Sequence, residues 1–300
     1  MILDSLFGRR KKESVFAGKT PEQIKEERKG LVPEPADIRQ ENLALEESVM
    51  REQETAANRP KEVADIVIED LRDPIENILV ELMPKIEAGA YSTIIGDDAS
   101  GRIPTIILAN VVKSVYELKN HPLPVVRFLA GSTGLNEEKE EVISGKTERL
   151  MQQVEKIRHT VTQHSEPKKV LVVTDIIETG ESIRTLLKAL DQNDWSADVA
   201  SIGGSDKTAI QTLSNHWRTR VICGGWKGPM IYKFKELSGV QKEHDKLFAV
   251  PHPEAEGEIV RYGREQARKM AGELFDKYKT KGLNKHPVYG ESITYIPRGS

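Results

Sequence analysis

Hydroxyl and carboxylate side chains gather in one short stretch of the sequence, residues 174–182. The aliphatic run Val170–Val173 before it predicts a buried strand, and the pattern of Ile183–Leu190 after it predicts a helix. The loop Glu178–Ser182 therefore stands at a helix N-terminus, where free backbone N–H groups and the helix dipole favour an anion such as phosphate. The carboxylates of Asp175 and Glu178 can accept hydrogen bonds from sugar hydroxyls or face a magnesium ion. The combination predicts a site for a phosphorylated ribose.

This stretch resembles the signature of the type I phosphoribosyltransferases. In that family a hydrophobic strand leads into two acidic residues, two hydrophobic residues and a phosphate loop of Asp-Thr-Gly and two small residues. Here Thr174 and Asp175 take the place of the acidic pair, and residues 178–182 take the place of the phosphate loop. The sequence departs from the signature at Thr174, which replaces an acid, and at Glu181, which stands where small residues are usual. The other interpretation is an ordinary strand-to-helix turn that binds no ligand.

A second loop of similar composition follows the predicted strand Tyr91–Ile95. In the type I phosphoribosyltransferases the loop after the first core strand holds the pyrophosphate of the donor, and Ser100–Arg102 resembles that loop. The guanidinium of Arg102 can bind phosphate oxygens. Asp97 and Asp98 admit two interpretations: a turn with a helix cap, or a contact that holds Mg²⁺ or Arg102 in place.

The resemblance implies a Mg²⁺-dependent enzyme that transfers phosphoribose from phosphoribosyl pyrophosphate to a nitrogen acceptor and releases pyrophosphate. It implies catalytic roles for Glu178, beside the anomeric carbon, and for Asp175, which would contact a ribose hydroxyl and reach Mg²⁺ only through water. The residues that it places around the ligand are Thr174, Asp175, Glu178, Thr179, Gly180, Glu181, Ser182, Asp98, Ser100, Gly101 and Arg102. The sequence does not select a purine, a pyrimidine or another acceptor.

Two other functions remain open from the sequence. The first is a regulatory module that keeps the fold and senses a phosphorylated ribose without turnover, as the two departures from the signature suggest. The long connection Gly131–Lys169 favours it, because most of this connection has a charged helical pattern and not that of a mobile closing loop. The second is an interaction protein that works through its N-terminal arm.

Alternating strand and helix patterns predict the fold. Five strands are expected at Tyr91–Ile95, Pro124–Leu129, Val170–Val173, Asp198–Gly203 and Arg220–Cys223. Helices are expected at Ile103–Glu117, Lys139–Gln163, Ser182–Leu190, Lys207–His216 and Glu256–Tyr278, after two earlier helices broken at Pro74. This order is typical of an α/β protein with a Rossmann-like parallel sheet flanked by helices on both faces, in which ligands bind at the carboxyl ends of the strands.

The predicted domain boundaries follow composition. Residues 1–60 are charged and are expected to form a largely helical or flexible extension, ahead of a phosphoribosyltransferase-like domain at 61–300. Within that domain the core is expected at about 90–225 and a C-terminal hood or helical part at about 226–300. The polar helix predicted at Ala36–Ala57 is interpreted either as an arm on the domain or as a helix for homo-oligomerisation or partner binding.

Composition excludes several classes of protein. The net charge of −3 gives no general attraction to nucleic acid, and a single cysteine, Cys223, leaves no internal disulfide or cysteine-based zinc site. Cys223 lies in a buried-strand pattern and is expected to be a core residue, not a nucleophile. The start Met1–Lys12 lacks the pattern of a signal peptide, and no apolar run is long enough to span a membrane, so we expect a cytoplasmic protein.

Overall fold

The computed structural model describes residues 61–97, 99, 101–129, 140–162, 168–226, 235–241, 248–252, 257–286 and 293–295. The chain divides into two units, Met1–Ala57 and Asn58–Ser300, and every described residue belongs to the second. The helix expected at Ala36–Ala57 and the rest of the extension 1–60 therefore lie outside the described residues.

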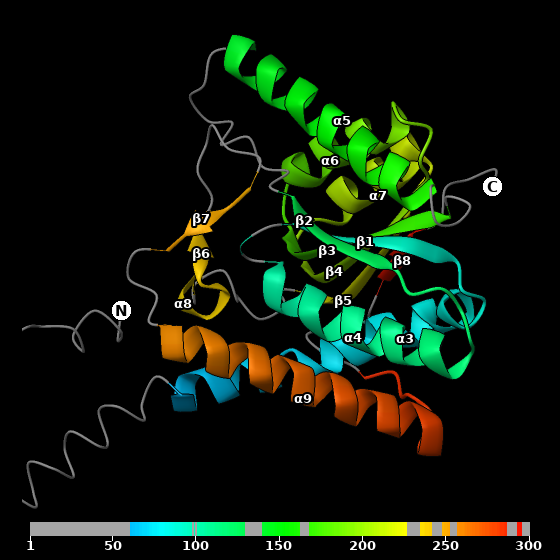
Figure 1. The fold of residues 1–300 in the computed structure, drawn as a ribbon, viewed down its shortest axis with the longest axis vertical. Coiled ribbons are helices and arrows are strands. Elements are labelled where there is room, and N and C mark those ends of the chain that lie inside the picture. The colour runs from blue at the N-terminus through cyan, green and yellow to red at the C-terminus, as the bar shows by residue number, and fades with distance from the viewer. Residues whose placement is uncertain are drawn as a thin grey trace, which may run out of the picture. The chain divides into compact units, whose positions relative to one another are not determined.

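The domain is built on a six-stranded sheet with strand order β2-β1-β3-β4-β5-β8 (Figure 1). Its strands are β1 (Tyr91–Asp97), β2 (Val125–Leu129), β3 (Lys169–Ile177), β4 (Ala197–Gly204), β5 (Arg220–Trp226) and β8 (Ile293–Tyr295). The first five are parallel, which confirms the predicted α/β fold, and β8 pairs antiparallel with β5. The chain places β2 on one side of β1 and β3 on the other, so the strand order reverses at the β1/β3 boundary.

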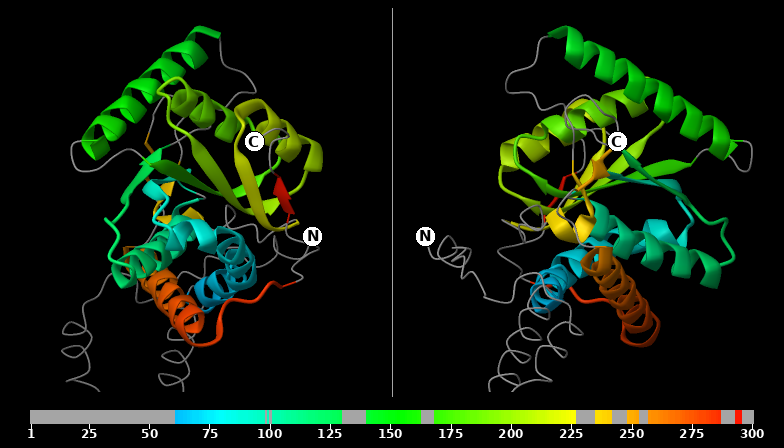
Figure 2. Two further views of the ribbon diagram at one scale, coloured as in Figure 1. Left: turned by 90° about the vertical axis from the view of Figure 1, so that its right-hand side faces the viewer. Right: turned by 60° about the vertical axis from the view of Figure 1, so that its left-hand side comes forward.

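Helices cover both faces of the sheet (Figures 1 and 2). Their bounds are α3 (Arg72–Glu87), α4 (Arg102–Leu118), α5 (Glu140–Thr162), α6 (Glu181–Asp191), α7 (Lys207–Trp217), α8 (Lys235–Ser238) and α9 (Gly257–Lys281), and a further helix spans 61–69. The helices α3 and α4 lie on one face, with α9 packed against α4 on the outside, and α5, α6 and α7 lie on the other. The long charged helix predicted between the second and third strands is α5.

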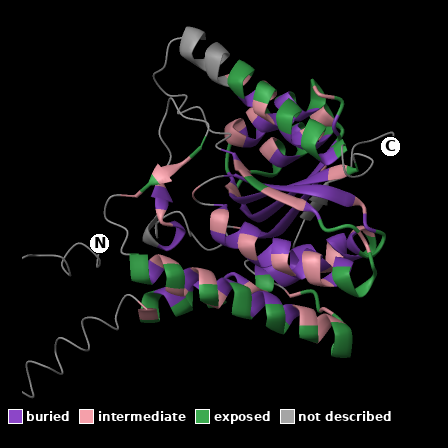
Figure 3. Cartoon of the chain, viewed as in Figure 1, coloured by how far each residue is buried: buried purple, intermediate pink, exposed green. Residues whose placement is uncertain are grey.

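The sheet is buried on both sides, so the core has two parts (Figure 3). Leu171 and Val173 of β3 pack with the cluster under α3, α4 and α9, whereas Val170 and Val172 pack with the cluster under α5, α6 and α7. Because the central strands are buried on both faces, their sequences are continuous apolar runs and do not alternate between apolar and polar residues.

The structure extends or adds to the predicted elements at three places. The strand β3 ends at Ile177, not at Val173, so the polar residues Thr174 and Asp175 lie inside the strand. Pro74 lies in the first turn of α3, where its missing N–H group has no intrahelical partner to lose. The strands β6 (Val240–Gln241) and β7 (Val250–Pro251), like β8, are too short to have a recognisable sequence pattern.

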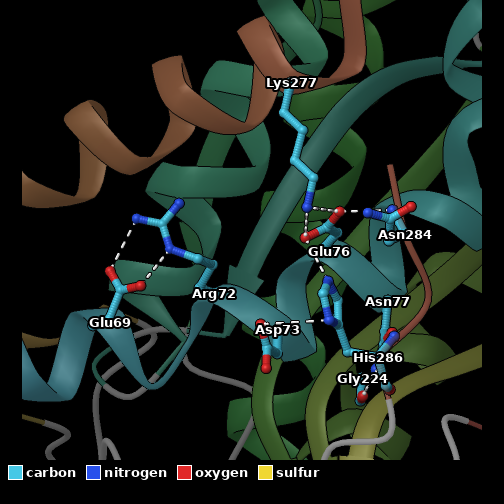
Figure 4. Close-up of polar contacts among 9 residues, drawn as sticks. All are labelled: Glu69, Arg72, Asp73, Glu76, Asn77, Gly224, Lys277, Asn284 and His286. Atoms are coloured by element: carbon cyan, nitrogen blue, oxygen red, sulfur yellow. Dashed lines mark hydrogen bonds and ion pairs between the residues drawn. The ribbon is translucent and has the colours of Figure 1, made fainter. Parts of the chain in front are cut away.

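A buried polar cluster joins the end of α9 to α3 and β5 (Figure 4). The carboxylate of Glu76, in a residue only 1% exposed, accepts hydrogen bonds from the backbone of Asn284 at 2.6 Å and from Lys277 Nζ at 2.8 Å. His286 Nε2 lies 2.8 Å from the same carboxylate. Burial alone would raise the pKa of Glu76, but these partners outweigh it and lower the pKa. The segment after α9 is therefore held by buried charge-assisted hydrogen bonds.

A second buried carboxylate lies at the amino ends of the strands. Asp198 in β4 is fully buried and binds Lys85 Nζ at 2.6 Å, Lys169 Nζ at 3.0 Å and the hydroxyl of Tyr91 at 2.8 Å. Burial acts to raise its pKa, but the bond from Lys85, the charge of Lys169 and the bond from Tyr91 lower it overall. These contacts tie α3 to three strands.

None of the helices in the described ranges combines the length and the apolar character needed to cross a membrane.

Candidate functional site

The two loops singled out in the sequence follow β1 and β3, the strands between which the strand order reverses. In open parallel sheets this switch point is where ligands bind, because the connections on either side diverge and leave a crevice. The first loop also lies against β3: a Cβ atom on Gly101 would lie 2.4 Å from the carbonyl oxygen of Asp97 and 3.0 Å from that of Val173 in β3. Only glycine permits this approach, so Gly101 allows the first loop to lie against β3.

Three polar side chains meet at the ends of these two strands. Asp97 of β1 is 2% exposed, Thr174 of β3 is fully buried and Asp175 is 5% exposed. The Thr174 Oγ1 atom lies 3.4 Å from Asp97 Oδ2 and 3.4 Å from Asp175 Oδ1. A carboxylate from β1 therefore stands beside the position at which the family signature would have an acid in β3.

The helices after both loops begin with a glycine N-cap. Gly180 precedes α6 with φ of 79°, in the left-handed region that glycine adopts without strain, and Gly101 precedes α4. Neither residue can cap the helix with a side chain, whereas Asp206 before α7 accepts a hydrogen bond from the Thr208 N–H at 2.7 Å. The N-cap residues of α4 and α6 thus offer no side chain such as α7 has, and at the start of α6 the Glu181 N–H donates to Thr179 Oγ1 at the long distance of 3.4 Å. Helix ends of this kind suit an anionic ligand.

The acidic residues in and just before the second loop differ in burial and in their partners. Glu178 is exposed, while Asp175 is buried, so the two carboxylates lie at different depths in the protein. Glu181 Oε1 forms an ion pair with Arg184 Nη1 at 2.7 Å along α6. This pairing gives the carboxylate that departs from the signature a positive partner. Thr179 is exposed and Ser182 is half-buried.

Arg102 is the first residue of α4 and is half-buried. Its guanidinium lies over the ring of Phe128, 4.8 Å from the ring centroid, and this contact orients a cation beside the first loop. Asp98 and Ser100 lie outside the described residues, so their predicted roles stay predictions.

Arg264 on α9, the helix that packs against α4, was not singled out from the sequence. Burial lowers the pKa of Arg264, and the positive charges of Arg102 and Arg268 lower it further. The available signal was the spacing of Arg261, Arg264 and Arg268, which places three cations on one side of a helix.

Two residues of β5, Cys223 and Trp226, were examined for a role at the site because they lie near the end of that strand. Cys223 is 1% exposed and burial raises the pKa of its thiol to about 12, which confirms it as a core residue. Trp226, the last residue of β5, has the ammonium of Lys207 5.1 Å from its ring centroid. One face of this indole is therefore already covered by a cation.

The oxygen atoms of the site fit the magnesium ion that the resemblance implies. Asp97, Thr174 and Asp175 supply hard oxygen donors, the kind that Mg²⁺ prefers. Throughout the described ranges no group of three or more His, Cys, Asp or Glu side chains is placed to hold a metal. Mg²⁺ needs no such cage when one or two carboxylates share it with the phosphates of a ligand.

The architecture defines a parallel α/β protein with a polar site at its topological switch point. No protein-family model matches the sequence, and the search of curated proteins finds no match either. Among solved structures the chain is similar to the hypoxanthine-guanine phosphoribosyltransferase of Schistosoma mansoni in complex with IMP, with 22% sequence identity and a TM-score of 0.30. The match covers 46% of this chain and 57% of that enzyme, so the chain spans little more than half of its length. At this TM-score the similarity does not assign the chain to a family.

Proposed function

We propose that the chain binds phosphoribosyl pyrophosphate between the β1–α4 and β3–α6 loops and transfers its phosphoribose to a nitrogen acceptor. One observation carries the proposal: two glycine-started helices, α4 and α6, flank the buried pair Asp97 and Thr174 at the switch point of the sheet. The N-termini of two helices favour anions, and the cluster between them can accept hydrogen bonds from hydroxyl groups. This arrangement suits a ligand that carries phosphate at both ends of a sugar.

Each part of the donor has a partner of suitable chemistry. The 5′-phosphate would accept hydrogen bonds from the start of α6, with Thr179, Gly180 and Ser182 around it. The pyrophosphate would lie at the start of α4, where Arg102 adds a positive charge. The ribose hydroxyls would donate to Asp175, the buried carboxylate between the two helix ends.

The chain's residues would act mainly by positioning and by charge. Mg²⁺, when bound, supplies positive charge to the pyrophosphate leaving group. Asp175 fixes the ribose so that the anomeric carbon faces the acceptor, and Arg102 holds the departing pyrophosphate. Glu178 stabilises the positive charge that develops on the sugar, because its carboxylate stands on the loop between strand and phosphate.

The first test is isothermal titration of the full chain with phosphoribosyl pyrophosphate in the presence of Mg²⁺, followed by pyrophosphate release with a panel of nucleobases. The proposal expects saturable binding and release with at least one base. No heat and no thermal shift at millimolar donor would reject both the enzyme and a ligand sensor. It would leave the N-terminal extension 1–60, which lies outside the described residues, as the working part.

A second function, a sensor without turnover, is favoured by Thr174, which replaces an acid of the signature, and by α5, which occupies most of the connection before β3. The variant Glu178→Gln separates the two functions. In an enzyme it lowers turnover far more than donor affinity, because the carboxylate acts most strongly as charge develops. Asp175→Asn lowers both, since the ribose contact also exists in the ground state. In a sensor no base supports turnover, and both variants change affinity alone.

A further inference from the structure

The helices α6 and α7 lie side by side on one face of the sheet, and a groove of about 250 Å³ opens between them (Figures 1 and 2). Its lining residues come from both helices: Arg184 of α6, and Thr212, Leu213, His216 and Trp217 of α7. Since these residues all belong to helices and not to the two candidate loops, the groove is distinct from the proposed donor site.

The groove offers an aromatic surface. Trp217 is half-buried and packs against the core cluster under α5, α6 and α7, which fixes its indole in place. The ring of the exposed His216 meets this indole edge to face, with the ring centroids 4.6 Å apart and the planes at 76°. A planar aromatic group can pack on such a pair of rings. The volume lies below the range of about 300–1,000 Å³ that is usual for drug-sized ligands, so the groove suits a small ring system.

Arg184 adds a positive charge to the same groove. Its exposed guanidinium already binds a carboxylate, since Arg184 Nη1 lies 2.7 Å from Glu181 Oε1. Both side chains of this ion pair are nearly half exposed, so the pair is weak and a ligand carboxylate can compete with Glu181 for the guanidinium. An aromatic surface beside a carboxylate-binding cation selects small aromatic carboxylates.

Two contacts connect the groove to the phosphate loop Glu178–Ser182. Leu213, which lines the groove, also lies against the N-cap of α6, because a Cβ atom on Gly180 would come within 2.8 Å of Leu213 Cδ1. The second contact is the ion pair of Arg184 with Glu181, the first residue of α6. A Glu181 carboxylate released from Arg184 is attracted to the positive end of α6 and repels a phosphate there. Occupation of the groove and binding of phosphate therefore oppose each other.

We propose that the α6–α7 groove binds a small aromatic carboxylate and thereby weakens phosphate binding at the loop Glu178–Ser182. The regulatory part rests on the proposed function, which places the 5′-phosphate at the start of α6, whereas the binding part does not. Glu181, which departs from the signature, then acts as the exchangeable partner of Arg184. Because coupling between two ligands is reciprocal, ribose 5-phosphate should weaken binding of the aromatic carboxylate by the same factor.

The first test measures binding of two probes, benzoate and 2-naphthoate, to the full chain by the fluorescence of Trp217. Trp217→Phe keeps an aromatic ring and should remove the signal, which assigns it to this residue. Saturable binding at millimolar concentration is expected. Cyclohexanecarboxylate has the same charge without the aromatic ring and should bind about fivefold more weakly than benzoate. If neither aromatic probe binds at millimolar concentration, the proposal is overturned.

Three variants test the charge in the groove. Arg184→Gln should weaken binding of both probes at least about fivefold. The matched control Lys188→Gln removes a positive charge one turn further along α6, at an exposed position outside the groove lining, and should bind them like the wild type. Equal losses in these two variants would show a general charge effect and overturn the site. Glu181→Gln removes the competing carboxylate and should bind the probes at least as tightly as the wild type, and weaker binding would contradict the competition.

The regulation is tested by isothermal titration with the groove saturated by benzoate. The dissociation constant for ribose 5-phosphate should rise at least about threefold, while that for inorganic pyrophosphate should change less than about twofold. Glu181→Gln should lose most of this coupling, because it has no carboxylate to release. An unchanged affinity for ribose 5-phosphate overturns the regulation. An effect of benzoate that survives in full in Glu181→Gln would mean direct competition at the phosphate loop and overturns it as well.

Failure of the groove and failure of the proposed function give different results. If ribose 5-phosphate and phosphoribosyl pyrophosphate bind but the aromatic probes do not, the groove is wrong and the function stands. If the probes bind through Arg184 but neither phosphate ligand binds, the groove stands as a binding site, the function is wrong and the regulation falls with it.

Discussion

The Thr174 hydroxyl lies 3.4 Å from Asp97 Oδ2, so the carboxyl ends of β3 and β1 share one buried polar cluster. A hydroxyl can donate to one carboxylate and accept from another group, and it carries no charge. Thr174 can therefore stand beside both Asp97 and Asp175 without electrostatic repulsion. The departure from the phosphoribosyltransferase signature has a physical reason, because the neighbouring strand already supplies a carboxylate.

The variant Thr174→Asp should be destabilised, although it restores the signature. It would place a third carboxylate within a buried cluster, and an uncompensated buried charge costs about 3 kcal/mol. Repulsion raises the pKa of the new carboxyl in the folded state, so the penalty is fully present at pH 7 and fades as the pH falls towards about 4. Urea unfolding at several pH values measures it, with Thr174→Asn as the neutral control. Equal stability of the Asp and Asn variants at pH 7 would contradict the crowded cluster.

The variant Gly101→Ala tests whether the first loop must lie against β3. The added methyl group would come within 2.4 Å of the Asp97 carbonyl oxygen, and this backbone atom cannot move without shifting the loop. We expect a loss of about 2 kcal/mol in the free energy of unfolding. The control is Gly272→Ala on the exposed side of α9, where a Cβ meets nothing within 4 Å. Gly272→Ala should increase the free energy of unfolding by about 0.5–1 kcal/mol, because alanine favours a helix interior over glycine. Urea unfolding should show a lower free energy of unfolding for Gly101→Ala and a higher one for Gly272→Ala than for the wild type. A Gly101→Ala variant as stable as the wild type would contradict the prediction.

The sequence predicted the strands and the loops because each depends on neighbouring residues. Val170–Val173 reads as a buried strand, and the polar loop Glu178–Ser182 follows it with a helical pattern behind it. Long-range contacts were not predictable in this way. Asp97 and Thr174 are 77 positions apart, and α9 packs on α4 although the two helices lie far apart in the chain. The strand order brings Asp97 beside Thr174, and local sequence patterns do not predict strand order or helix packing.

The variant Glu76→Gln should remove the acid sensitivity that the cluster at the end of α9 imposes. Because the folded-state pKa of Glu76 is lowered, its stabilising effect is present above its unfolded pKa and is lost as the pH falls through the folded value. The wild type should therefore lose stability below about pH 4 more steeply than the variant. At pH 7 the variant should be the less stable of the two, since Gln cannot pair with Lys277 as an ion. Parallel pH profiles for the two proteins would show that Glu76 contributes no titrating stability.

The variant Asp198→Asn should separate stability from ligand binding. Asp198 lies at the amino ends of the strands, whereas the candidate site lies at their carboxyl ends, so the substitution leaves the site intact. Two lysines would remain beside an uncharged amide, with an expected loss of about 3 kcal/mol at pH 7. Since the folded-state pKa of Asp198 is lowered, the difference from the wild type should shrink as the pH falls below about 4.

The measurement for Asp198→Asn pairs urea unfolding with titration of phosphoribosyl pyrophosphate at a temperature where the variant is fully folded. Lower stability with unchanged affinity is the expected outcome, because the ion pairs of Asp198 hold α3 against the sheet and do not reach the switch point. A parallel loss of affinity in Asp198→Asn would mean that the two edges of the sheet are coupled, and ligand affinities of the other variants would then have to be corrected for stability.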